Sequence, residues 1–205
     1  MLQEHAVKRE TAKQRYDRII NNLFSFLFFI APLTRAGVNI VAPILAIVWV
    51  IKKIKFRGDP EEAFKYPDLL KGIGLLGVAI LLSLINVIDY ARAVKNTLDE
   101  YVLLSIIFII SLDVIKTEKQ VRKLLKIGII SALLVGIYGV YEHYVLGYQR
   151  IESTFSVATQ TGVYLIGVAL LTFAFLFLRK TSKRSTLFFA FLFFSFILFC
   201  TFLTG

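Results

Sequence analysis

Residues 138–162 read YGVYEHYVLGYQRIESTFSVATQTG and join two long apolar segments of the chain. Four tyrosines surround a glutamate and a histidine in this stretch, and Arg150 follows them. The flanking segments, residues 127–146 and 159–178, can each cross a hydrocarbon core, which takes about 17–25 residues of helix. The stretch therefore predicts a polar connection between two membrane-spanning helices.

The composition of the whole chain fits the same class of protein. Of its 205 residues, 57% are hydrophobic and only 19% are charged, with a mean hydropathy of +0.72. A soluble domain of this length could not bury so much apolar surface. We expect an all-α, polytopic integral membrane protein whose residues 19–205 form about seven spans. These are predicted at residues 19–34, 37–53, 72–88, 101–115, 127–146, 159–178 and 186–203.

Three features of this plan concern its ends and its first pair of spans. Residues 1–18 are charged and are expected to form a cytoplasmic amphipathic segment. The first two apolar segments are slightly short for the core, so two thin spans and a re-entrant pair fit equally well. The chain stops at Gly205, at the end of an apolar run, which predicts a protein truncated at its C-terminus.

The positive charges predict the orientation. Twenty of the 24 lysines and arginines lie in residues 1–18, 52–71, 116–126 and 179–184. The other four are Arg35, Arg92, Lys95 and Arg150. Because positive loops resist translocation, the N-terminus is expected in the cytoplasm and residues 138–156 outside. The net charge of +10 is explained by this orientation, so no nucleic-acid partner is expected.

Several kinds of site have no signature in the sequence. Only two histidines, His5 and His143, are present, and no paired His, Cys or carboxylate spacing accompanies them. Neither a phosphate-binding glycine loop nor a nucleophile elbow occurs. The single cysteine, Cys200, cannot form an internal disulfide. We therefore expect no metal and no cofactor.

Arg150 is the main candidate for a binding residue. It lies on the side that disfavours arginine, beside a run of Ser, Thr and Gln side chains. A guanidinium binds phosphate oxygens bidentately and stays charged, which suits a lipid diphosphate at a membrane entrance. The alternatives are a pair with Glu142 or Glu152, or ordinary contact with lipid headgroups.

Other polar side chains carry weaker predictions. Arg35, at the other outer turn, is a second candidate for the anionic pocket or an interfacial arginine that snorkels. Tyr141 and Tyr148 fit an interfacial aromatic belt or a surface that stacks on sugars. His143 fits an acid or base in acceptor contact or a structural interfacial histidine. Asp113 is expected to be a solvated carboxylate with no special role.

The chain resembles the N-terminal part of the O-antigen ligase and O-antigen polymerase family of bacterial membrane glycosyltransferases. The resemblance rests on residues 32–40 (PLTRAGVNI), which join the first two spans, and on residues 82–89 (LSLINVID), which end the third. Residues 150–155 (RIESTF) are similar to the outer arginine and the following Ser/Thr-Phe stretch of that family. The closing residues 202–205 (FLTG) are similar to the end of the span before its Ser-Arg-Gly motif.

This resemblance implies a metal-independent glycosyltransferase in the bacterial inner membrane, with its site facing the periplasm. Its donor would be a polyprenyl-diphosphate-linked glycan, used in polysaccharide or lipopolysaccharide biosynthesis. Its acceptor would be lipid A-core sugar or a second lipid-linked glycan. Arg150 would hold the donor diphosphate, and the catalytic residues would lie beyond Gly205. In this chain residues 156–160 (SVATQ) stand where the family usually has an Asn-Pro-Asn-like turn.

Two other functions are open at this point. A transporter or flippase-like protein could use Arg35 and Arg150 to guide an anionic solute, and would carry charges or broken helices near mid-bilayer. A non-enzymatic membrane scaffold would not need the two arginines to converge.

Overall fold

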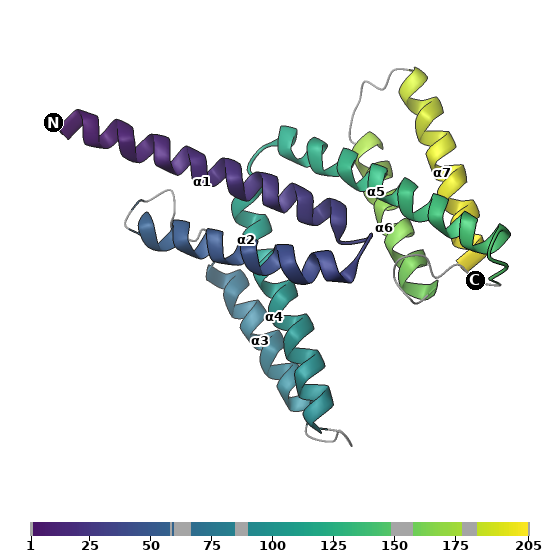
Figure 1. Cartoon of the computed structure of the whole chain (residues 1–205), viewed down its shortest axis with the longest axis horizontal. Coiled ribbons are helices and arrows are strands. Elements are labelled where there is room, and N and C mark those ends of the chain that lie inside the picture. Colours follow the sequence, from purple (N-terminus) through teal and green to yellow (C-terminus); the bar gives the residue numbers. More distant parts are fainter. Residues whose placement is uncertain are drawn as a thin grey trace. The chain divides into compact units, whose positions relative to one another are not determined.

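The computed structural model describes residues 2–57, 59, 67–84, 90–148, 158–177 and 184–204. Within these residues all regular elements are helices, which confirms the all-α class (Figure 1). The seven helices are α1 (Leu2–Ile30), α2 (Arg35–Lys55), α3 (Pro67–Ser83), α4 (Tyr90–Val114), α5 (Glu118–Tyr144), α6 (Ala158–Phe177) and α7 (Arg184–Thr204).

Two of the described helices, α2 and α5, are long and apolar enough to cross a membrane. Shorter apolar helical stretches occupy Tyr101–Val114, Gln160–Ala174 and Ala190–Thr204. Length and composition alone support these assignments, and a core helix of a soluble protein can share both properties. A membrane location therefore has weak support here, and the seven spans stay a prediction.

Two helices continue through boundaries that the polarity of the sequence suggests. The charged residues 2–18 and the apolar residues after them form the single helix α1, which ends at Ile30 before a turn that contains Pro32. Residues 90–100, which lie between the predicted spans 72–88 and 101–115, belong to the same helix as residues 101–114. A helix interior tolerates charged side chains, so a change in polarity does not by itself end a helix.

The start of α5 has a sequence-encoded cap. Thr117 accepts a hydrogen bond from the backbone N–H of Gln120, and the Gln120 side chain accepts one from the backbone N–H of Thr117. This reciprocal pair is a capping box, which satisfies two N–H groups that the first helical turn leaves open. It explains why the charged residues after Lys116 begin a helix that runs on to Tyr144.

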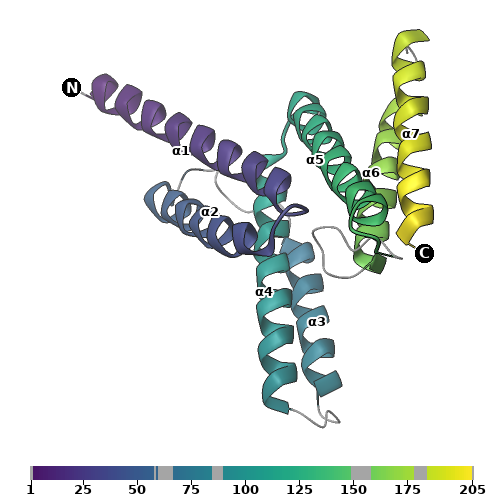
Figure 2. The same ribbon diagram turned by 45° about the vertical axis from the view of Figure 1, so that its right-hand side comes forward.

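The chain divides into two compact units. The first unit contains Met1–Phe24 and Ala42–Lys116, and the second contains Ser25–Val41 and Thr117–Gly205. In the first unit α3 and α4 lie side by side (Figures 1 and 2). The Tyr101 hydroxyl of α4 donates to the backbone carbonyl of Ile73 in α3 and also lies against Gly77.

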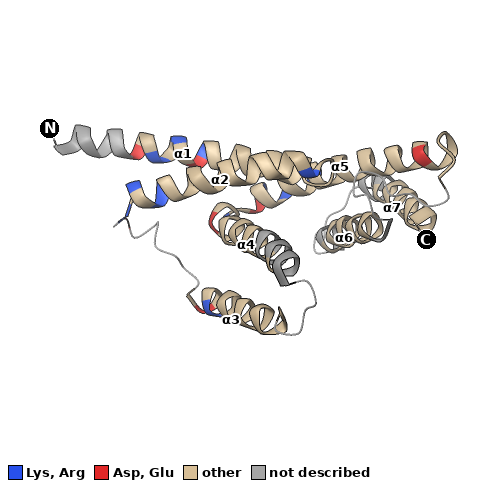
Figure 3. Cartoon of the chain, turned by 60° about the horizontal axis from the view of Figure 1, so that its bottom comes forward, with Lys and Arg blue, Asp and Glu red and all other residues tan. Residues whose placement is uncertain are grey.

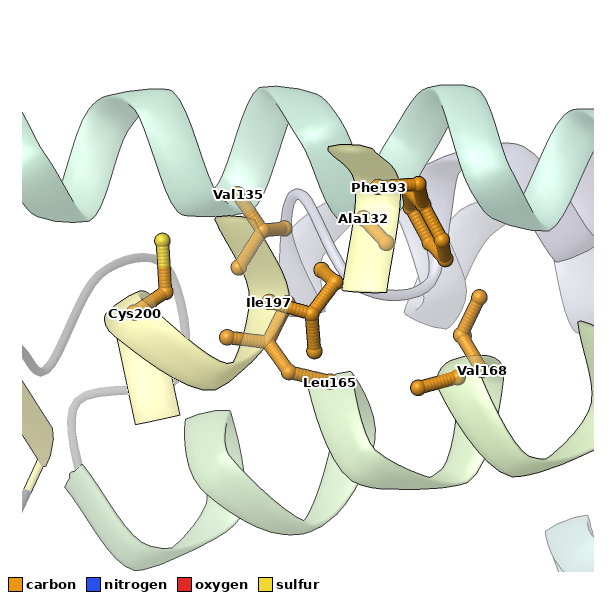
Figure 4. Close-up of a cluster of buried hydrophobic side chains, with 8 residues drawn as sticks. Ala132, Val135, Leu165, Val168, Phe193, Ile197 and Cys200 are labelled. Atoms are coloured by element: carbon orange, nitrogen blue, oxygen red, sulfur yellow. The ribbon is translucent and has the colours of Figure 1, made fainter. Parts of the chain in front are cut away.

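The second unit packs α5, α6 and α7 around one apolar cluster (Figure 4). Ala132 and Val135 come from α5, Leu165, Val168 and Ala169 from α6, and Phe193, Ile197 and Cys200 from α7. Small residues of α5 allow it to pack closely against its neighbouring helices. A Cβ atom added to Gly136 would lie 2.7 Å from a ring carbon of Phe196, so a larger residue here would force the neighbouring side chains to shift.

Candidate functional site

Among the described residues, a polar cluster at the end of α2 joins this helix to the end of α4. The Trp49 indole Nε1 donates to Oδ2 of Asp113 at 3.0 Å, and Lys53 Nζ lies 3.1 Å from the other carboxylate oxygen. Trp49 and Lys53 are one helical turn apart, so both side chains reach the end of α4. The Lys53 ammonium also lies 5.7 Å from the Trp49 ring centroid.

Lys52 continues the cluster towards α1. Its side chain is only 2% exposed, and its Nζ lies 2.7 Å from Oδ1 of Asp17. A buried ammonium is costly unless a carboxylate compensates it, so the pair holds α1 and α2 together at this level. Lys13 of α1 makes a similar contact of 2.8 Å with Asp59, just after α2.

The prediction for Asp113 was therefore wrong. Its side chain is only 15% exposed and binds two side chains of α2, whereas a solvated carboxylate was expected. The sequence contained one usable signal, which is the turn-spaced pair of an indole donor and an ammonium at Trp49 and Lys53. It contained no signal that α2 and α4 would bring these groups to the same acid.

Of the residues predicted to bind the donor, Arg150 lies outside the described residues. Arg35 is the first residue of α2 and is exposed. Its guanidinium Nη2 donates to the side-chain oxygen Oε1 of Gln160 in α6 at 3.3 Å. Gln160 belongs to the stretch 138–162, so the second unit brings Arg35 to the stretch that contains Arg150.

The turn after α5 positions the other predicted side chains. His143 Nδ1 lies 2.8 Å from the backbone carbonyl of Tyr148, and Gly147 between them has a φ of +75°, which favours glycine. Tyr141 and Tyr148 are exposed. The Tyr138 and Tyr141 rings stack at 6.3 Å. The histidine thus holds the turn, while exposed tyrosines fit both an aromatic belt and a sugar surface.

Glu142, near the end of α5, is buried although the tyrosines around it are exposed. Its residue is 7% exposed, although Tyr141 and Tyr144 on either side are exposed. In α6, the next element along the chain, Thr161 is fully buried next to the exposed Gln160. From the sequence, Glu142 is predicted only as an alternative partner of Arg150, because helix position alone does not tell which polar side chain turns inward.

The chemistry of these side chains suits binding of an anion by hydrogen bonds and charge. Arg35 and Gln160 supply N–H donors, which can hold phosphate oxygens without a metal ion. Across the residues that the structure describes, no group of three His, Cys, Asp or Glu side chains is arranged to hold a metal.

Comparison of the chain with family models, curated proteins and solved structures finds no match.

Proposed function

We propose that this chain is the N-terminal part of a membrane glycosyltransferase similar to O-antigen ligases and polymerases. It spans the bacterial inner membrane about seven times with its N-terminus in the cytoplasm. Its outer side binds the diphosphate of a polyprenyl-linked glycan donor, and Arg150 and Arg35 supply the positive charge.

The observation that carries this proposal is the hydrogen bond from Arg35 to Gln160. Arg35 and Arg150 are two of the only four cations outside the four basic segments. Gln160 lies in the first turn of α6, the helix that follows the connection containing Arg150. Arg35 therefore contacts one end of residues 138–162, the stretch that contains Arg150, the residue predicted to bind the diphosphate. Arg35 and this stretch are far apart in sequence.

The chemistry needs little more than charge and orientation on the donor side. A lipid diphosphate is already a good leaving group, and fixed cations stabilise the negative charge that develops on it. The acceptor hydroxyl still needs a base. No residue of this chain is assigned that role.

Binding of undecaprenyl diphosphate to the purified protein in detergent micelles tests the proposal. Arg150→Ala and Arg35→Ala should each weaken binding about tenfold or more, because each removes a charged hydrogen-bond donor. Undecaprenol, which has no phosphate, should bind much more weakly to the wild type.

A matched variant is Arg122→Ala, which removes an arginine of α5 that pairs with Glu118 on the same helix. It has the same effect on net charge and should leave diphosphate binding unchanged. Equal affinity of the wild type and both test variants, or equal loss in all three variants, would refute the role of the two arginines.

A further inference from the structure

The structure separates the cations in the middle of α1 and at the end of α2 into two groups. Lys13, Lys52 and Lys53 pair with carboxylates of the first unit. The second group is exposed, and no carboxylate of the described residues pairs with it. This group, the basic surface, consists of Arg15, Arg18, Lys55 and Arg57.

The basic surface comes from α1, from the end of α2 and from the turn that follows α2, and side-chain contacts hold the two helices together there. Asp17 of α1 pairs with Lys52 of α2, and the Lys55 ammonium lies 5.2 Å from the Tyr16 ring centroid. The Tyr16 ring also contacts Phe56 edge-on, with centroids 6.0 Å apart. Figure 3 shows basic residues on both helices in this region. The cross-helix contacts therefore bring cations of both helices together.

Exposed apolar side chains border the basic surface on both helices. Ile19 of α1 follows Arg18 directly, and Ile54 of α2, which is 69% exposed, precedes Lys55. Further exposed aliphatic side chains precede Ile54 along α2, namely Ile47, Val50 and Ile51. The surface thus changes from apolar to cationic next to the aromatic residues Tyr16 and Trp49. This pattern is found at a membrane–water interface.

We propose that the basic surface binds the headgroups of anionic phospholipids. The bordering isoleucines would contact acyl chains, and the four cations would meet phosphate groups at the depth where headgroups lie. A nucleic acid or a soluble anion would satisfy the cations but leave the apolar border in water. The inference rests on the membrane location in the proposed function and is independent of the glycosyltransferase activity.

The only tryptophan of the chain, Trp49, gives a local readout. It lies in α2 among the bordering aliphatic residues, three positions before Lys52. The full chain is reconstituted in bilayers of phosphatidylcholine and phosphatidylglycerol. In one set of samples the phosphatidylcholine carries bromine on its acyl chains, and in the other set the phosphatidylglycerol does. Bromine quenches tryptophan fluorescence on contact, so the two quenching curves give the association constant of the anionic lipid at Trp49 relative to phosphatidylcholine.

We expect this relative constant to exceed about five, the preference that one cation near an anionic surface supplies. High salt should reduce it through screening. Replacing all four basic-surface residues by glutamine should bring it close to one. A matched variant replaces four cations of α5 by glutamine and should keep the wild-type value, namely Lys119, Arg122, Lys123 and Lys126.

Each other outcome contradicts a defined part of the inference. Equal quenching by both brominated lipids in the wild type, or the same loss in both glutamine variants, would overturn the headgroup site alone. Loss of the preference on adding millimolar inorganic phosphate at constant ionic strength would show a site for free anions instead. No quenching by either lipid would refute the membrane location itself.

Discussion

Asp113 shows how a single carboxylate can join two side chains of another helix. It accepts the indole N–H of Trp49 and pairs with Lys53, and its side chain is largely shielded from water. If the carboxylate is removed, the Trp49 indole and the Lys53 ammonium lose their acceptor, and water has little access to replace it. The geometry thus assigns this residue a stabilising role between α2 and α4.

We predict that Asp113→Asn lowers the free energy of unfolding by about 1–3 kcal/mol, because the charge that faces Lys53 is lost. Asp113→Ala should lower it further, since the indole also loses its acceptor. Detergent-induced unfolding followed by Trp49 fluorescence measures both. Asp68→Asn is the control, because the Asp68 side chain is 88% exposed and its pair with Lys71 should contribute little. Equal effects at Asp113 and Asp68 would contradict this assignment.

At the scale of the element, α5 presents small residues to its neighbours. A Cβ atom on Gly128 would meet Phe28 at 3.1 Å, and one on Gly136 would meet Phe196 at 2.7 Å and Cys200 at 3.1 Å. Ala132 between them is fully buried. Spacing of four residues places all three on one face, which allows close helix approach. Close packing is thus the structural role of this face.

Gly136→Ala is expected to destabilise the second unit by about 1–3 kcal/mol, because the added methyl group overlaps the Phe196 ring. Gly167→Ala on α6 is the matched control: nothing lies within 4 Å of its added Cβ. That change should be neutral or slightly stabilising, since alanine has a higher helix propensity than glycine. The double variant Gly136→Ala/Phe196→Leu should recover part of the loss. Equal thermal unfolding midpoints for the two glycine variants would disprove the close contact.

At the scale of the whole molecule, the proposed topology depends most on α5. Its 27 residues span about 40 Å, which exceeds the ~30 Å of a hydrocarbon core. The lysines and arginines of α5 lie in its first part, and its tyrosines lie in its last turns. The asymmetry of charge predicts that the helix begins in the cytoplasm.

Labelling with a membrane-impermeant maleimide tests this topology from the two ends of one helix. In a Cys200→Ser background, Tyr144→Cys should react on intact cells and Lys119→Cys only after permeabilisation. Both positions are exposed in the structure, so burial does not limit either reaction. Reaction of both positions under the same condition would show that α5 does not cross the membrane.

The sequence by itself determined the helical class, and residues close together in the chain set the capped start and the small-residue face of α5. These follow from composition and from spacings within one helix, which local geometry fixes. The polarity of the sequence does not mark where α1 and α4 begin, because a helical backbone satisfies its own hydrogen bonds whether side chains are charged or apolar.

Only the tertiary structure decided which charges meet. Lys52 and Lys53 are neighbours in the sequence, yet one pairs with Asp17 of α1 and the other with Asp113 of α4. Likewise, Arg35 reaches Gln160, which lies in a helix 125 residues away along the chain. One step along an α-helix turns a side chain by about 100°, so adjacent lysines face different helices. The partner of each is then set by which helix packs on that face.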